Sequence, residues 1–324
     1  MNKMRPIEKI PLNQIDDSDD TFSINFMPDL HGLRSSILEI GLIQPVLLRK
    51  KSGGYQIICG FRRISVVKEL GKSEIEARVF EEKEVDEFQL FSLSLRENLT
   101  TRGFNTVEKA ISLEKLVHRF RIDSDTVIKN FLPLFSLEPN EKILNTFLSL
   151  AGMEDRIKEY VLKEEVSRSN IRKLANLTPD DRVAILSLIS HLKLGENRLR
   201  EILTFLEEIS RRNQCKAKEI VQRADIQVIL SQKEFTSSQK TERIKKVLMD
   251  LRYPAMHQLE EEFQKKRKGL NLPSSISLHH SPFFEGKELR VEFQFETIEE
   301  YQSIVSALSL LLDREEFQEI LRST

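Results

Sequence analysis

The stretch that decides the fold is ICGFRRISVVKELG, residues Ile58–Gly71. A β-prone run at 55–59 follows a Ser-Gly-Gly turn, so we expect a strand there. After Gly60, apolar residues recur at helical spacing until a closing Leu-Gly pair, which predicts a short helix with a glycine just past its end. Gly60, Arg62 and Arg63 therefore lie at a strand-to-helix junction.

Such a junction is typical of phosphate-binding sites. The free backbone N–H groups of a first helical turn and two guanidinium groups are all good phosphate donors. A paired Arg at a helix start is also often only a solvated surface feature, and the helix dipole disfavours cations there. The residues of the junction leave both interpretations open.

Composition sets broad limits on the protein class. The chain has 324 residues, of which 40% are hydrophobic, so two or three domains with real cores are expected. Lys and Arg number 50 against 51 Asp and Glu, so only the distribution of charge can point to nucleic acid. The two cysteines, Cys59 and Cys215, form no zinc or disulfide pattern. With no long apolar run, we expect a cytoplasmic protein without membrane association.

Changes in hydrophobic periodicity predict an α+β protein of three domains. Residues 1–103 alternate short strands and helices, and residues 104–224 are helical throughout. Residues 225–324 form a small α+β domain with one long charged helix from about Ser237 to Lys268, two strands and a last helix over 297–312. One face of the second of these strands carries Leu289, Val291, Phe293 and Phe295. An apolar hairpin face of this size needs a partner surface, so we expect a homodimer through this domain.

Three stretches, in this order, resemble the N-terminal domain of the ParB family of DNA partition proteins, whose fold is shared with sulfiredoxin. They are LRSSILEIGLIQPVLLRK at 33–50, GFRRISVVKELG at 60–71 and RENLTTRGFNTVEKA at 96–110. A later stretch, residues 143–182, is similar to the family's helix-turn-helix segment and the helices after it. The resemblance implies a ParB/sulfiredoxin-like first domain and a helical middle domain with a degenerate helix-turn-helix.

The resemblance also implies a ligand, because in ParB-like proteins these boxes surround CTP and Mg²⁺. The residues that would contact the nucleotide are Gln44, Gly60, Arg62, Arg63, Glu97, Asn98 and Arg102. Glu97 and Asn98 would also lie at the metal, since carboxylate and amide oxygens suit magnesium, and Glu97 would take part in any hydrolysis. An alternative for Glu97 and Asn98 is a helix end with an asparagine cap.

Two departures from the family pattern bear on catalysis. Phe61 stands where the family has the Glu of its Gly-Glu-Arg-Arg box, and the family Arg that follows Glu-Asn falls on Thr101, with Arg102 one residue late. We therefore expect nucleotide binding and at most a weak CTPase. Sulfiredoxin-type chemistry would need a cysteine at the position of Phe61, and we interpret Cys59 as a buried core thiol.

The DNA-binding residues are harder to predict. The recognition helix would begin near Pro139, with Asn140, Lys142 and Asn145 as the only obvious readers of base edges. Between Lys240 and Lys268, nine Lys and Arg face five Asp and Glu, and this stretch ends in the basic run Lys265, Lys266, Arg267 and Lys268. Such a stretch suits a phosphate backbone, although a charged helix with intrahelical ion pairs would have the same composition.

Together these features predict a DNA-binding protein of chromosome or plasmid partition, nucleoid-associated and homodimeric. A ParA-type ATPase is a further expected partner. Two alternatives remain: a phosphotransferase or nuclease on the same N-terminal fold, or an adaptor that has lost nucleotide binding. The long helical, partly basic region after the first domain favours a protein that holds DNA.

Overall fold

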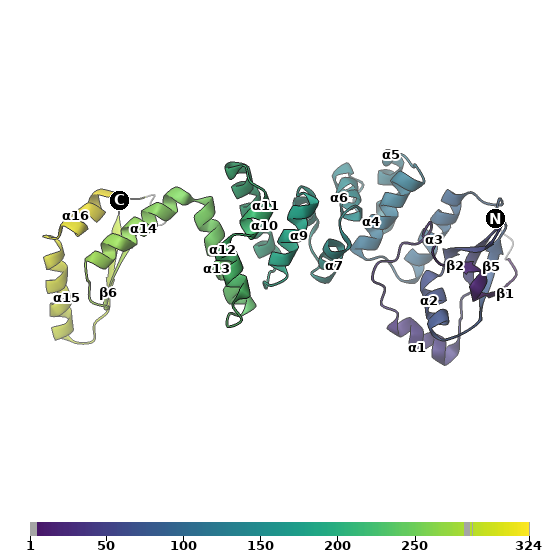
Figure 1. Ribbon diagram of the computed structural model, residues 1–324, viewed down its shortest axis with the longest axis horizontal. Helices are drawn as coiled ribbons and strands as arrows, with labels where there is room; N and C mark the ends of the chain where they lie inside the picture. The colour runs from purple at the N-terminus through teal and green to yellow at the C-terminus, as the bar shows by residue number, and fades with distance from the viewer. Residues whose placement is uncertain (1–4, 282–285, 287, 324) are drawn as a thin grey trace. The chain divides into compact units, whose positions relative to one another are not determined.

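The structure is a computed structural model that describes residues 5–281, 286 and 288–323 (Figure 1). The described residues divide into two compact units, of which the first ends at Leu186 and the second begins at Ser187. The predicted α+β class is confirmed, with a β/α region followed by helices and a small C-terminal β/α part. The predicted domain boundaries after residues 103 and 224 stay predictions.

The first unit opens with a mixed five-stranded sheet in the order β1-β5-β3-β4-β2. The strands are β1 (Glu8–Pro11), β2 (Ile15–Asp16), β3 (Val46–Lys51), β4 (Gly54–Cys59) and β5 (Glu74–Phe80). The central strand β3 pairs antiparallel with β4 and parallel with β5. A Ser-Gly-Gly turn joins β3 directly to β4, as the sequence predicts.

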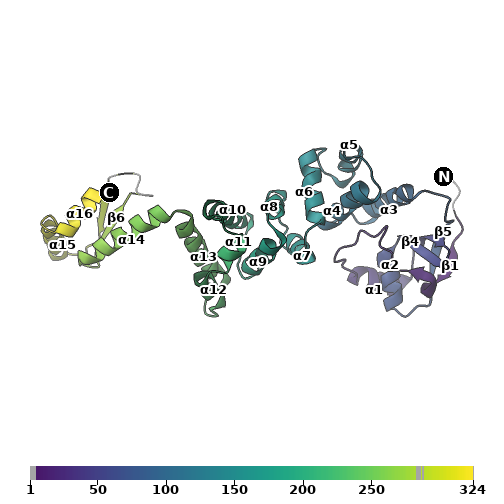
Figure 2. The same ribbon diagram turned by 45° about the horizontal axis from the view of Figure 1, so that its top comes forward.

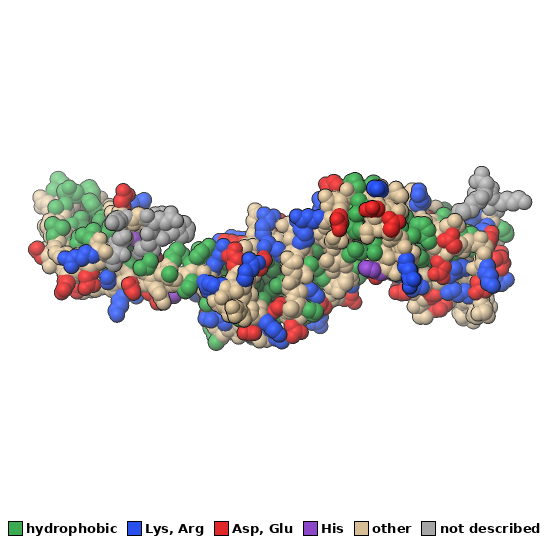
Figure 3. Space-filling view, turned by 90° about the horizontal axis from the view of Figure 1, so that it is seen from above, with side chains coloured by type: hydrophobic (Ala, Val, Ile, Leu, Met, Phe, Trp, Pro, Cys, Tyr) green, Lys and Arg blue, Asp and Glu red, His purple; other side chains and the backbone are tan. Residues whose placement is uncertain are grey.

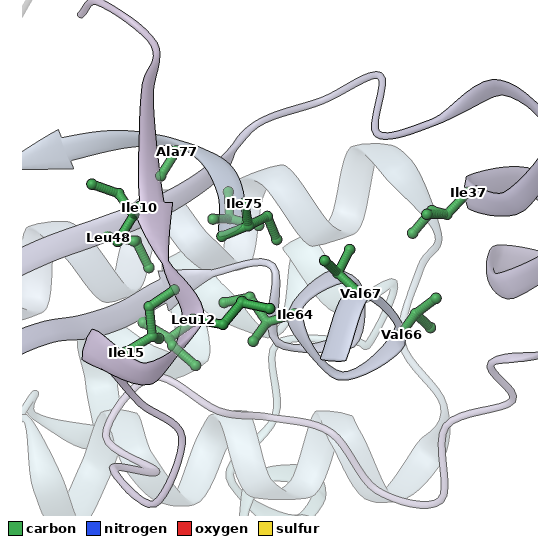
Figure 4. Close-up of a cluster of buried hydrophobic side chains, with 12 residues drawn as sticks. Ile10, Leu12, Ile15, Ile37, Leu48, Ile64, Val66, Val67, Ile75 and Ala77 are labelled. Carbon is green, nitrogen blue, oxygen red and sulfur yellow. The ribbon is translucent and has the colours of Figure 1, made fainter. Parts of the chain in front are cut away.

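Three helices lie beside the sheet, and two of them pack against it in a shared hydrophobic core. These helices are α1 (His31–Ile40), α2 (Phe61–Glu69) and α3 (Glu87–Thr101), and Figures 1 and 2 show α1 and α2 beside the strands. Ile37 of α1 and Ile64 and Val67 of α2 join one cluster with buried residues of the sheet (Figure 4). Each fully buried aliphatic side chain contributes about 1.5–3 kcal/mol. The cluster thereby fixes α2 against the strand that precedes it.

The rest of the first unit is helical. It contains α4 (Thr106–Glu114), η2 (Lys115–Arg119), α5 (Ser124–Thr126), η3 (Val127–Phe131), η4 (Pro133–Phe135), α6 (Glu141–Ala151), α7 (Asp155–Lys163), α8 (Arg168–Ala175) and the start of α9 (Pro179–Ile189). α6 packs on both α4 and α8. The stretches SLEPNE, AGMED and LTPDD contain the connections that precede α6, α7 and α9.

Two of these helical segments, η2 and η3, are π-helical turns. Lys115 of η2 is buried and donates hydrogen bonds to the backbone carbonyls of Asp20 and Thr21. Arg119 donates to the Thr21 hydroxyl at 2.7 Å. The wide turn of η2 thus ties the helical region to the segment that follows the first two strands.

The second unit begins with five helices. They are α10 (Glu196–Asn213), α11 (Ala217–Val221), α12 (Ala224–Ser231), α13 (Ser237–Arg252) and α14 (Pro254–Gly269). α10 and α13 pack together with ion pairs between Arg198 and Glu242 and between Glu201 and Lys245, each at 3.0 Å. Because the pairs advance in the same direction along both helices, α10 and α13 run parallel. Exposed pairs of this kind contribute only about 0–1 kcal/mol each, so the buried face carries most of the packing energy.

The prediction of one long helix from about Ser237 to Lys268 is wrong. The chain breaks between α13 and α14 at Tyr253, whose φ of −123° and ψ of 65° are not helical. Pro254 is the reason, because its ring disfavours a helical residue before it and removes a backbone N–H. Charged residues recur at helical spacing on both sides of Pro254, so the hydrophobic and charge pattern of the sequence does not reveal this break.

The C-terminal part contains β6 (Ile276–His280) and β7 (Leu289–Phe293), which pair antiparallel, followed by α15 (Ile298–Leu311) and α16 (Glu315–Ser323). Most of the connection between the strands lies outside the described residues. The prediction that the chain ends in a single helix is wrong, because α16 follows α15 and packs on α14. Within the described ranges, no helix combines the length and apolar character that a bilayer span needs.

Candidate functional site

The candidate site begins at Gly60, where β4 passes directly into α2. Gly60 is the N-cap of α2 with φ 107° and ψ 19°, a left-handed conformation. A Cβ atom at this position would lie 2.6 Å from Cγ1 of Val46 on the neighbouring strand β3. Both the backbone angle and the close approach therefore require glycine. Gly60 has no side chain with which to cap the first turn of α2, so the backbone N–H groups and positive end of this turn can face an anion.

This junction lines a cavity of about 290 Å³ in the first unit. The cavity walls include all seven residues predicted to contact nucleotide, namely Gln44, Gly60, Arg62, Arg63, Glu97, Asn98 and Arg102. They come from the loop before β3, the start of α2 and the end of α3, so residues far apart in sequence meet at one place. Their role in nucleotide binding stays a prediction.

Arg63 and Glu97 form an ion pair at the cavity. Nη2 of Arg63 lies 2.8 Å from Oε1 of Glu97, and Nη1 donates to the backbone carbonyls of Gln44 and Pro45. The other Glu97 oxygen, Oε2, accepts a hydrogen bond from the Cys59 thiol at 2.9 Å. Both carboxylate oxygens are thus already engaged, and Cys59 is the buried thiol that the sequence predicts.

Asn98 connects the same elements through its amide. Its Nδ2 donates to the backbone carbonyl of Ser94 at 2.9 Å and to the Cys59 sulfur at 3.4 Å, while its Oδ1 accepts from Nε of Arg102 at 3.0 Å. Both Glu97 and Asn98 lie inside α3, so the alternative interpretation as a capped helix end is wrong. The capping asparagine is instead Asn105, at the start of α4.

Glu108 is the site residue that sequence reasoning missed. Its carboxylate is 1% exposed and accepts from Nη2 of Arg62 at 2.6 Å and from Nη1 of Arg102 at 2.7 Å. Arg102 therefore reaches the cavity although it stands one residue later than the family pattern. Glu108 also completes a capping box with Asn105. Asn followed three residues later by Glu signals that box, but nothing in the pattern signals a buried carboxylate between two arginines.

The rest of the cavity wall is both polar and apolar, and its polar members are Asn25, Asp29, Ser94 and Thr101. Phe22, Ile24, Leu33 and Phe61 line it, and Phe61 also packs against the core of the sheet. Phe61 therefore fills space at the position where the ParB pattern has a carboxylate. The cavity combines three arginines with several apolar side chains, which suits a polyanion attached to a flat ring system.

The predicted recognition helix is α6, which begins at Glu141. Asn140 is its N-cap, and the Asn140 side-chain oxygen accepts from the backbone N–H of Lys142 at 2.8 Å. Lys142 and Asn145 are exposed. Because its side-chain oxygen is used in the cap, Asn140 is a poorer candidate for base contacts than these two residues.

The predicted basic run occupies the last turns of α14, in the second unit. Lys265 and Lys268 are exposed, whereas Lys266 lies 3.5 Å from Glu319 of α16 and is half-buried like Arg267. Cations at a helix C-terminus also interact favourably with the helix dipole. The run therefore has a structural explanation beside the predicted contact with phosphates.

The N-terminal residues match a known family. Residues 1–99 match the family model described as the ParB N-terminal domain. They form a ParB N-terminal domain. The resemblance predicted from the sequence is confirmed for this region. Arg102 and Glu108 lie just beyond the matched residues, so the ParB N-terminal domain and the start of the helical region build the cavity together.

Curated relatives extend the likeness beyond this ParB N-terminal domain. The "Probable chromosome-partitioning protein ParB" of Campylobacter jejuni is 31% identical over 174 residues, which are 54% of this chain and 59% of that protein. The "Nucleoid occlusion protein" of Halalkalibacterium halodurans is 28% identical over 176 residues, 53% of this chain and 59% of that protein. The chain thus spans about three fifths of the length of these two relatives.

Solved structures with similarity to this chain include two ParB proteins. A C-terminally truncated ParB from Caulobacter crescentus, complexed with CTP-gamma-S, is 22% identical with a TM-score of 0.26, and the match covers 56% of this chain and 97% of that one. A Pnob8-like ParB-N domain is 17% identical with a TM-score of 0.37, covering 80% and 99%. The assignment of the ParB N-terminal domain rests on the family model and the curated relatives.

The Cys59 thiol predicts a specific loss of stability at alkaline pH. Burial, and then the neighbouring Glu97 carboxylate, raise the pKa of Cys59 from 9.0 to about 12. As pH rises above 9.0, the unfolded chain loses this proton while the folded chain keeps it, so stability falls until the folded pKa is reached. We expect this loss, at most about 1.4 kcal/mol per pH unit, to be absent in Cys59→Ser.

The measurement is urea unfolding of both proteins between about pH 8 and about pH 10.5 under reducing conditions. Other titrating groups are common to both proteins, so the difference between their free energies of unfolding isolates Cys59. Parallel pH profiles for the two proteins would contradict the prediction.

Proposed function

We propose that this chain is a ParB-like DNA-binding protein of chromosome or plasmid partition that binds CTP with Mg²⁺ in the cavity beside Gly60. The observation that carries the proposal is the convergence of seven predicted residues on one cavity with three arginines and a free helix N-terminus. The ParB N-terminal domain and relatives named as chromosome-partitioning and nucleoid occlusion proteins support the same function. Nucleoid association and a ParA-type ATPase partner belong to this proposal.

In the proposed complex, the triphosphate lies against the first turn of α2. Arg62, Arg63 and Arg102 are the cations within reach, and guanidinium groups pair with phosphate oxygens in bidentate geometry. The nucleoside lies toward the apolar wall that includes Phe22 and Phe61. The cavity thus offers charge and hydrogen bonds to one end of the ligand and an apolar surface to the other.

The magnesium part of the proposal depends on few protein ligands. No cluster of three His, Cys, Asp or Glu residues suited to a metal occurs in the described part of the chain. Magnesium bound with a nucleotide commonly takes one or two carboxylates and otherwise phosphate and water oxygens. Glu97 and the Asn98 amide would be the protein donors, and they would share or exchange their present contacts with Arg63, Cys59 and Arg102 to bind the ion. The ion would neutralise phosphate charge there. Since Phe61 replaces a carboxylate, we propose slow hydrolysis or none.

Replacement of Arg62 tests the nucleotide proposal. We expect calorimetry to show magnesium-dependent CTP binding to the wild-type protein and a loss of more than about tenfold in affinity for Arg62→Ala, because a charged hydrogen bond contributes about 1.5–3 kcal/mol. Arg34→Ala, on the exposed side of α1 and outside the cavity, is the matched control and should bind as wild type.

Titration with ATP and GTP, each with and without magnesium, distinguishes the alternatives. An adaptor that has lost nucleotide binding would give no heat with any of the three nucleotides at about millimolar concentration, and this result would refute the proposal. A phosphotransferase or nuclease would instead turn over substrate in the presence of CTP or metal at a rate that depends on Glu97.

The proposed DNA contact is mainly with the phosphate backbone. α6 exposes only one basic residue among the three predicted readers, Lys142, whereas α14 ends in four consecutive cations. Phosphate contacts confer affinity with little sequence preference and are weakened by salt. In this proposal, α14 supplies most of the affinity for the phosphate backbone, and α6 is responsible for any sequence preference.

Charge reversal tests the DNA proposal. We expect log affinity to fall with log salt by roughly 0.9 per phosphate contact, and replacement of Lys265, Lys266, Arg267 and Lys268 by Glu to weaken all duplexes alike and flatten this slope. The measurement is fluorescence anisotropy on random and genomic duplexes at several salt concentrations. Asn145→Ala and Lys142→Ala are the comparison variants, and a strong sequence preference that either one removes would overturn the backbone mode.

The C-terminal part carries an apolar surface that fits a second copy of the chain. Phe293, Phe295 and Tyr301 cluster with ring centroids 5.0–6.3 Å apart, yet Phe295 is 51% exposed. Val291 and Val305 extend this surface, and Figure 3 shows hydrophobic side chains gathered over the C-terminal elements. A contiguous exposed patch of this kind is typical of an interface, so we propose a homodimer through β7 and α15.

Truncation and one point variant test the dimer. A chain ending at Tyr253 keeps α13, which packs on α10, and should be monomeric because it lacks the whole surface. Phe295→Glu should weaken association of the full chain, whereas Glu299→Gln, an exposed neighbour outside the aromatic cluster, should not. Sedimentation that finds the wild-type protein monomeric at tens of micromolar (about the range where a stable interface is filled) would refute the dimer.

A further inference from the structure

Glu108 occupies a position that the proposed nucleotide function does not use. Its carboxylate is buried behind the cavity and accepts hydrogen bonds from Arg62 and Arg102, two of the three arginines that line it. Glu108 is not itself among the lining residues. It therefore contacts two of the cations of the site without lining the cavity itself.

The charges around the cavity are largely compensated by the protein itself. Arg63 is paired with Glu97, while Arg62 and Arg102 share Glu108. Burial, and then the nearby Arg102 guanidinium, lower the pKa of Arg62, while the Glu108 carboxylate acts in the opposite direction. Glu108 is thus a counter-charge that the two arginines share.

Arg102 keeps hydrogen-bonding capacity for a ligand. Among the described residues, its Nη2 is buried without a hydrogen-bond partner, although Nη1 and Nε are both engaged. The guanidinium lies over the ring of Phe104, 5.2 Å from its centroid, which holds its plane. A buried donor without an acceptor is costly, so an anion that reaches Nη2 would gain a prepared hydrogen bond.

Glu108 also belongs to the start of α4. The backbone N–H of Glu108 donates to Oδ1 of Asn105 at 2.8 Å, and the Asn105 N–H donates to Oε2 of Glu108 at 3.2 Å. The same oxygen, Oε2, accepts from Arg102. α4 in turn packs on α6, the predicted recognition helix. One carboxylate oxygen therefore serves both the cavity and the first turn of the helical region.

We propose that Glu108 is an internal competitor of the ligand phosphates, which holds Arg62 and Arg102 while the cavity is empty and releases at least one of them when a polyphosphate binds. This inference rests on the proposed anion binding at the cavity. When Arg102 is released, Oε2 of Glu108 loses one of its two hydrogen-bond donors and keeps the backbone N–H of Asn105. Ligand binding in the cavity is thereby linked to the capping box at the start of α4. Glu108 acts as a positioning residue, since it touches the arginines and not the ligand.

The neutral variant Glu108→Gln distinguishes two roles for Glu108. The carboxylate either competes with ligand phosphates for the arginines or only holds the arginines in place for the ligand. Gln is nearly isosteric and its amide oxygen can still accept from Asn105, but it no longer neutralises the arginines. Competition predicts that affinity for inorganic tripolyphosphate, and for CTP, rises by about tenfold in this variant. Glu108→Asp keeps the charge but is too short to reach both arginines, so a smaller increase is expected.

A second measurement follows the helix cap. Hydrogen exchange at the amides of Glu108 and Lys109 should change when tripolyphosphate is added to the wild-type protein, and should respond less in Glu108→Gln. Asn105→Ala is the matched control, because it breaks the capping box while leaving the Glu108 charge. It should speed exchange at the start of α4 without raising anion affinity.

The outcomes separate this inference from the proposed function. If tripolyphosphate binds more tightly to Glu108→Gln but no nucleotide binds, the inference holds and the CTP proposal fails. If CTP binds the wild type as tightly as the variant, or more tightly, CTP binding stands and competition by Glu108 is refuted. If neither protein binds any of these anions while both remain folded by circular dichroism, both ideas are refuted.

Discussion

The lack of a side chain at Gly60 is the constraint on which the first unit depends. A strand that becomes a helix within one residue must reverse its backbone there, and the left-handed φ of 107° does so. Val46 of the neighbouring strand β3 occupies the space that a Cβ atom at position 60 would need. Because no loop intervenes, the backbone that carries Arg62 and Arg63 is joined directly to the sheet.

The arginines of the cavity are paired with carboxylates. These ion pairs connect the region of the sheet with the helices that follow it. Glu97 comes from α3 and Glu108 from α4, so each arginine of α2 is paired with a helix that follows the sheet. Breaking either pair would leave a buried or half-buried charge without a partner, which is far more costly than loss of an exposed pair. The ion pairs therefore fix the order of elements around the cavity as well as its charge.

Much of this arrangement could be predicted from the sequence, because local signals and tertiary contacts agree. The Ser-Gly-Gly turn and the glycine at 60 mark β4 and α2, and three ordered boxes identify the residues that meet at the cavity. Glu108 could not be found in this way, since its position in a capping box already explains a Glu there. Its second role depends on how the start of α4 meets Arg62 of α2, and that is decided by packing over a long sequence separation.

The failures in the second unit have different causes. Pro254 signals a helix end, but the charged periodicity continues on both sides of it. Leu312, Asp313 and Arg314 separate α16 from α15 without a glycine or proline that would signal the break. In the predicted recognition helix, Ile143, Leu144 and Phe147 are buried, whereas Leu148 is only partly buried.

The π-helical turns η2 and η3 have a consequence for how this region can vary in length. A π turn closes over one more residue than an α turn, and η2 and η3 follow directly on α4 and α5. Removing one residue within η2 would rotate the residues after it by about 100° relative to α4. Lys115 and Arg119, at the two ends of η2, could then no longer both contact Asp20 and Thr21. The spacing between α4 and α6 is thereby restricted against insertions and deletions, a restriction that ordinary surface loops do not impose.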